Sequence, residues 1–130
     1  MWQSRGCRPV SRLPDRLDLA LTRRLRDVVA GRPATESELR TLADQAGGWA
    51  RATEAQLRAC EGRLATLNAD AASPLAEIAT EMRRADALTR ELEEARALIR
   101  GLEERTRQLR TEYLKLHAES ARQRLGREQA

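Results

Sequence analysis

A seven-residue repeat of apolar side chains over residues 85–116 constrains this chain more than any other feature of its sequence. Positions a and d of a heptad are those that face a neighbouring helix. The a positions are Ala85, Leu92, Ile99, Thr106 and Tyr113, and the d positions are Leu88, Ala95, Leu102, Leu109 and Leu116. Nine of these ten positions are apolar. A repeat of this length in one register predicts a coiled coil.

The larger side chains of this heptad seam are the candidate partner-binding residues. They are Leu88, Leu92, Ile99, Leu102, Leu109, Tyr113 and Leu116. Burying each of them contributes roughly 1.5–3 kcal/mol before the cost of ordering the chain. A helix cannot bury such a seam against itself unless another helix folds back along it. We therefore expect the seam to be left uncovered by this chain and to bind a helix of another protein.

The composition agrees with an all-α, elongated architecture of two long helices and a short N-terminal helix. Only 2% of the residues are aromatic, whereas 34% are charged. Aromatic side chains supply the largest buried areas in compact cores, so a thick core or a β-sandwich is not expected. Abundant alanine, leucine, arginine and glutamate is typical of long helices.

The N-terminal third divides into a tail and a short helix. We expect residues 1–13, which are basic and contain Gly6 and Pro9, to be disordered. An amphipathic helix is predicted over residues 14–30, from Pro14 in its first turn to a stop at Gly31 and Pro33. This helix is too short to be stable unless it packs on another element.

A second helix is predicted over residues 35–72. It begins with a capping-box pattern at Thr35–Glu38, and the adjacent Gly47 and Gly48 form a weak point, a kink or a place of close approach. Trp49 is a candidate secondary contact with a partner, or else packs within a local hairpin. Cys60 lies on the apolar stripe and is interpreted as a small buried residue.

Residues 73 and 74 leave two architectures open. Ser73 is a plausible N-cap with Pro74 at the first helical position. The chain either turns back here as a helical hairpin or continues as a rod that is kinked at the proline. A C-terminal coiled coil is predicted over residues 74–125, with Gly126 ending the helix.

The sequence contains no recognisable catalytic, metal-binding or cofactor-binding pattern. His117 is the only histidine, and it is interpreted as a solvated flank of the seam. There is no cysteine and histidine cluster with zinc-ligand spacing and no glycine-rich phosphate loop. No apolar run approaches the roughly 18 residues of a membrane-spanning helix. We expect a protein that is not an enzyme, takes no small-molecule substrate and has no membrane span.

The charges bear on what the chain binds. Arg105 and Arg110 would face each other in a parallel homodimer, which favours a different coiled-coil protein as the partner. Residues 1–33 carry eight arginines and three aspartates, a basic excess that would suit nucleic acid or an anionic surface. That interaction, and a self-contained helical bundle, are the alternatives to an adaptor or scaffold subunit.

Residues 97–123 resemble a stretch of the intraflagellar transport protein 20 family. The similar residues are Ala97-Leu98-Ile99, then after eleven residues Thr111-Glu112-Tyr113, followed by Leu116, Ala121 and Gln123. Pro74 and the arginine-rich start differ from that family's pattern. The resemblance implies a small coiled-coil adaptor of a ciliary transport assembly, in the cytoplasm, at the cilium or associated with the Golgi. It implies no catalytic residue.

Overall fold

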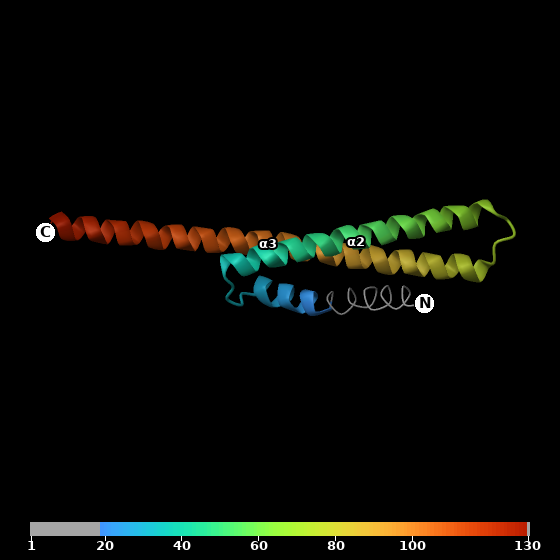
Figure 1. Ribbon diagram of the computed structural model, residues 1–130, viewed down its shortest axis with the longest axis horizontal. Coiled ribbons are helices and arrows are strands. Elements are labelled where there is room, and N and C mark those ends of the chain that lie inside the picture. The colour runs from blue at the N-terminus through green and yellow to red at the C-terminus, as the bar shows by residue number, and fades with distance from the viewer. Residues whose placement is uncertain (1–18, 130) are drawn as a thin grey trace, which may run out of the picture.

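The computed structural model describes residues 19–129, and all regular structure within that range is helical. An N-terminal helical segment covers residues 19–29, α2 spans Glu36–Ala69 and α3 spans Leu75–Gln129 (Figure 1). The all-α prediction is therefore confirmed for this part of the chain. The expected basic tail at residues 1–13 and the start of the helix expected from residue 14 lie outside the described residues.

The two long helices lie side by side and run in opposite directions (Figure 1). The indole Nε1 of Trp49 donates a hydrogen bond to Glu91 Oε1 at 2.9 Å, and the Cys60 thiol donates to Glu81 Oε2 at 3.0 Å. Trp49 precedes Cys60 in α2, whereas Glu91 follows Glu81 in α3. This order of contacts is that of two antiparallel helices. Because α2 has 34 residues and α3 has 55, α3 extends beyond its neighbour.

A short turn between Ala69 and Leu75 reverses the chain, so the helix does not continue through the proline. The Asp70 side chain accepts a hydrogen bond from the Ala72 amide at 2.9 Å, and the Asp70 carbonyl accepts one from the Ser73 amide at 3.1 Å. Pro74 lies just before α3, and its carbonyl accepts a hydrogen bond from the Glu77 amide at 3.1 Å. Local hydrogen bonds at Asp70 thus hold the turn that the sequence pattern left open.

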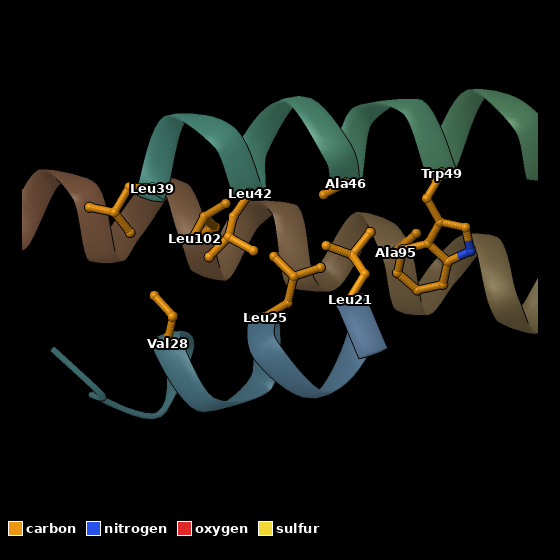
Figure 2. Packing of buried hydrophobic residues seen from close by; sticks show 9 residues of the cluster. All are labelled: Leu21, Leu25, Val28, Leu39, Leu42, Ala46, Trp49, Ala95 and Leu102. Atoms are coloured by element: carbon orange, nitrogen blue, oxygen red, sulfur yellow. The ribbon is translucent and has the colours of Figure 1, made fainter. Parts of the chain in front are cut away.

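The N-terminal helical segment packs across both long helices (Figure 2). Its apolar stripe of Leu21, Leu25 and Val28 points toward α2 and α3, and Leu25 is completely buried. The whole cluster consists of Leu21, Leu25, Val28, Leu39, Leu42, Ala46, Trp49, Ala95 and Leu102. Three helices therefore meet around one apolar core in the middle of the molecule, which meets the requirement that the short helix pack on another element.

The predicted stop of the first helix is confirmed at Gly31. The Arg32 amide bonds to the Asp27 carbonyl at 3.0 Å and the Gly31 amide bonds to the Val28 carbonyl at 3.1 Å. These paired bonds form a Schellman motif, whose turn residue has a positive φ. Gly31 has φ +116°, a conformation that a residue with a Cβ rarely adopts. The motif directs the chain from the short helix into α2.

The predicted cap of α2 is also confirmed. Thr35 precedes the helix, and its hydroxyl oxygen accepts a hydrogen bond from the Glu38 amide at 3.1 Å. Within α2, Gly47 and Gly48 do not mark a close approach between helices. A Cβ at either position would meet only the flexible Arg51 side chain, at 3.3 Å and 4.0 Å.

The prediction that Gly126 ends the last helix is wrong, because α3 continues to Gln129. One glycine costs a helix about 1 kcal/mol relative to alanine, and the good helix formers around it, Arg124, Leu125 and Arg127, maintain the helix through it.

A different glycine, Gly101 in α3, is where the short helix approaches most closely. A Cβ built there would lie 2.9 Å from Val29 Cγ1 and 3.1 Å from Val29 Cγ2. Valine is β-branched and stiff at χ1, so it has few ways to move aside. The absence of a side chain at Gly101 therefore permits the N-terminal helical segment to dock.

We expect Gly101→Ala to lower the free energy of unfolding by about 1–3 kcal/mol relative to Gly62→Ala, because the added methyl overpacks the contact with Val29. Gly62 is the matched control: it also lies in a helix interior, and a Cβ there meets nothing within 4 Å. Both variants gain the same helix propensity, about 1 kcal/mol. Urea unfolding followed by circular dichroism measures the difference, and equal stabilities would contradict the docking contact.

Cys60 is completely buried between the long helices, as the sequence predicts. Its thiol donates to the Glu81 carboxylate, and Arg63 Nε lies 3.3 Å from the same carboxylate oxygen. The hydrogen bond to Glu81, reinforced by burial and by the negative charge of Glu81, raises the pKa of the Cys60 thiol. The same hydrogen bond, reinforced by Arg63, lowers the pKa of Glu81. A small polar cluster therefore joins α2 to α3 near the turn.

We expect the protonated Cys60 thiol to stabilise the fold below its ordinary pKa of 9.0, and this contribution to be lost as the pH rises above that value. The free energy of unfolding of the natural chain should fall above about pH 9 more steeply than that of Cys60→Ala, which has no thiol to ionise. Chemical unfolding over a pH series measures both slopes. Parallel curves for the two chains would show that the thiol is not coupled to folding.

Candidate partner-binding surface

The chain itself covers much of the heptad seam. Leu88, Leu92 and Leu102 are buried within the molecule, and Leu102 keeps only 2% of its surface exposed. Ile99 and Leu109 are partly buried and pack against the core cluster. The expectation that this whole seam is left uncovered is therefore wrong. The reason is that α2 folds back along α3 and the N-terminal helical segment closes the remaining side.

The last two predicted seam residues lie beyond this cover. Tyr113 is 61% exposed and Leu116 is 63% exposed. The Tyr113 hydroxyl is 2.7 Å from His117 Nε2, and the two rings meet edge to face with centroids 4.7 Å apart. Tyr113 is thus an exposed aromatic residue that contacts His117 of the same helix, and it is not a core residue. His117 is exposed, as predicted.

Trp49, the predicted secondary contact, belongs to the core cluster and is only 6% exposed (Figure 2). Its indole N–H donates to Glu91 across the helix pair. A buried Trp usually finds such a partner for its N–H. Trp49 therefore ties α2 to α3 and is not displayed to a partner.

Charged residues beside the covered seam interact within the chain as well. Arg96 Nη2 lies 3.9 Å from Glu54 Oε2, and Arg110 Nη2 lies 3.7 Å from Glu36 Oε1. Arg105 donates to the Gly31 carbonyl at 3.4 Å, at the C-terminal end of the N-terminal helical segment, where a cation interacts favourably with the helix dipole. These side chains serve the fold of a single chain, and a homodimer is not needed to explain them.

Past Glu36, the first residue of α2, α3 continues alone, as the orange-to-red end of Figure 1 shows. Every residue from 110 to 129, which we call the overhang, is exposed. At about 1.5 Å per residue this segment is roughly 30 Å long. Its large apolar side chains are Tyr113, Leu114, Leu116 and Leu125. Tyr113 and Leu116 continue the heptad seam, whereas Leu114 and Leu125 lie on another side of the helix, and exposed apolar side chains of this kind are suited to contact with another helix.

A groove lies at the base of the overhang, where α2 begins. Its volume is about 380 Å³, and it is lined by Ala34, Glu36, Leu39, Thr106, Leu109, Arg110, Tyr113 and Leu114. Five of these eight residues are apolar, and the charged pair of Glu36 and Arg110 also lines the groove. This basal groove continues the covered part of the seam into the exposed part.

A second apolar stripe on the overhang escaped the heptad reading. Leu114, Ala118, Ala121 and Leu125 follow one another at steps of four, three and four residues, which places them on one side of the helix. They fall at positions b and f of the predicted heptad, which normally face water. The spacing alone indicates this stripe, although the heptad repeat assigns its positions to the solvent side.

Residues 19–129 contain no group of three or more His, Cys, Asp or Glu side chains placed to hold a metal ion. No helix in the same range is long and apolar enough to cross a membrane. Comparisons with protein-family models, with curated proteins and with solved structures gave no match to this chain.

We expect a chain that ends at Arg110 to unfold within about 0.5 kcal/mol of the full chain, because the removed residues bury nothing in the core. By contrast, Leu102→Ala should cost about 2–5 kcal/mol, since it opens a cavity at a completely covered site. Urea unfolding of the three chains measures both values. A large loss on truncation would mean that the overhang stabilises the fold and is not a free surface.

Proposed function

We propose that this protein is a non-enzymatic coiled-coil adaptor, whose helical bundle supports α3 while the overhang binds a helix of another protein. In this proposal α2 and α3 pack as an antiparallel coiled coil. A partner helix occupies the continuation of the seam, at Tyr113 and Leu116, and reaches the basal groove. The single observation that carries the proposal is that residues 110–129 are helical and exposed yet contain four large apolar side chains.

The contrast between the two halves of α3 supports this assignment. The seam in the bundled half is buried by the chain itself, whereas the overhang lacks the tertiary packing that supplies most of a helix's stability in proteins. Burying Tyr113 and Leu116 would contribute roughly 1.5–3 kcal/mol each before ordering costs, which favours association. Arg105 and Arg110, whose like charges argued against a parallel homodimer, interact within the chain with the Gly31 carbonyl and with Glu36.

The resemblance to the intraflagellar transport protein 20 family suggests where to look for the partner. The resemblance covers residues 97–123 of this chain, which include the last part of the covered seam and most of the overhang. Coiled-coil subunits of a ciliary transport or vesicle-trafficking assembly, in the cytoplasm, at the cilium or near the Golgi, are the first candidates. This setting rests on that resemblance alone.

Affinity capture from the native cell, with quantitative mass spectrometry, tests the proposal. We expect Leu116→Asp to reduce recovery of the captured partner at least tenfold, because a carboxylate in the interface would be buried without a counter-charge. Ala87→Asp is the control, since it adds the same charge at an exposed position of the bundled part of α3. Leu102→Asp is not a clean test, because Leu102 is buried in the core.

Circular dichroism of each variant verifies that the fold is retained. Equal recovery of the same proteins by the natural chain and by Leu116→Asp, with both folded, would refute binding through the overhang.

A further inference from the structure

The second apolar stripe of the overhang, Leu114, Ala118, Ala121 and Leu125, has a chemical pattern of its own. Leu114 is 66% exposed and Leu125 is 58% exposed, with two alanines between them. Leu114 lines the basal groove and also a shallow depression of about 490 Å³ that continues along the helix. The first half of the stripe, Leu114 and Ala118, therefore forms a surface that is continuous with the groove at the bundle.

Cations border this stripe on both sides. At about 100° per residue, Lys115 and Arg122 lie roughly 70–90° from its centre on one side, and Arg124 lies about as far on the other. Glu112 and Glu119 lie further round, at roughly 130–150° from the centre, although Glu119 lines the edge of the depression. Glu128 lies roughly 50° from the centre, but three residues beyond Leu125 and so past the end of the stripe. Within the described part of the chain, Lys115, Arg122 and Arg124 form no ion pair, whereas arginines of the bundle, such as Arg63 and Arg96, do.

This charge pattern selects against a second copy of the chain. The stripe has its own heptad register, with Leu114 and Ala121 at d and Ala118 and Leu125 at a, so that Arg110 lies at g and Lys115 at the following e. In a parallel pair of identical helices these two cations would face each other. In an antiparallel pair each flank faces its own equivalent, so the cations would again meet cations. Like charges in either arrangement disfavour self-association.

The apolar residues themselves favour a helix over a lipid surface. Two of the four stripe positions are alanines, which bury little area in a bilayer but let a second helix approach closely. No aromatic side chain lies in this stripe to anchor it at a membrane interface. A protein helix gains close packing at Ala118 and Ala121 and reaches a leucine at each end.

We propose that this cationic-flanked stripe binds an amphipathic helix whose apolar seam is bordered by glutamate or aspartate. The proposal rests on the adaptor function above and adds a second binding surface to the overhang, roughly 110–170° round the helix from Tyr113 and Leu116. Acidic residues at the flanking positions would pair with Lys115, Arg122 and Arg124, while the leucines and alanines bury the seam. Electrostatic complementarity of this kind sets which partner binds more than how tightly.

Three fluorescent helical peptides of equal length test this inference by anisotropy with the full chain. All carry leucine at a and d; the first has glutamate at e and g, the second has lysine there, and the third has its glutamates on the outer b, c and f positions. We expect the first peptide to bind at least tenfold more tightly than either of the others. We also expect its affinity to fall with added salt.

Reversing the flanks provides the matched variant. The triple change Lys115→Glu, Arg122→Glu and Arg124→Glu should reverse the preference, so that the lysine-flanked peptide binds more tightly. The control changes three exposed bundle cations that are not in ion pairs, Arg51, Arg90 and Arg100, to glutamate and alters the net charge equally. The control should retain the preference for the first peptide.

Equal binding of the glutamate-flanked and lysine-flanked peptides would overturn the acidic-partner inference and leave the adaptor function to be decided by the capture experiment. Binding of none of the peptides would overturn it as well. Tighter binding to phosphatidylserine vesicles than to the first peptide would overturn it in favour of a lipid surface. A dimer in sedimentation that Leu114→Asp abolishes would overturn it in favour of self-association.

Discussion

The unequal lengths of the two antiparallel helices determine which part of α3 is buried and which part is exposed. The turn after Ala69 sends α3 back along α2, and α3 is the longer by more than twenty residues. An antiparallel pair covers the longer helix only as far as the shorter one reaches. Part of the heptad seam is thereby buried by the chain itself, and the rest projects beyond the bundle. One half of α3 therefore stabilises the fold, and the other half is exposed.

The N-terminal helical segment makes the bundled part a three-helix structure. Leu21, Leu25 and Val28 lie against both long helices, and the docked position depends on the bare backbone of Gly101. The Schellman motif at Gly31 and the cap at Thr35 then join this segment to α2 with a connection of only a few residues. Two elements near each other in sequence thus pack against a third that is distant in sequence.

Much of the local structure was predictable because it depends on neighbouring residues. The stop at Gly31, the cap at Thr35 and the apolar spacing of the helices all follow from short-range rules. The chain reversal was not predictable, because Pro74 is compatible with either a kink or a turn. The hydrogen bonds that Asp70 makes in the turn have no strong sequence signal.

The contacts of a third helix were not predictable, because a heptad repeat describes the contact between two helices. Gly101 falls at position c, which a two-stranded coiled coil leaves in water, but a third helix packs there. The role of Trp49 stayed open between a partner contact and packing within a hairpin, because no neighbouring residue in the sequence indicates that Glu91 faces it. The heptad repeat predicted only part of the exposed surface. Of its candidate residues, Tyr113 and Leu116 are exposed, whereas Leu88, Leu92 and Leu102 are buried. Which helix covers a seam depends on tertiary contacts.

Amide hydrogen exchange along α3 of the purified chain tests most directly the claim that the molecule covers one half of this helix and leaves the other free. The account predicts strong protection at residues 88–102, whose seam is buried, and fast exchange at residues 111–129, where the helix is unsupported. Strong protection throughout residues 111–129 in the isolated chain, or none at residues 88–102, would contradict it.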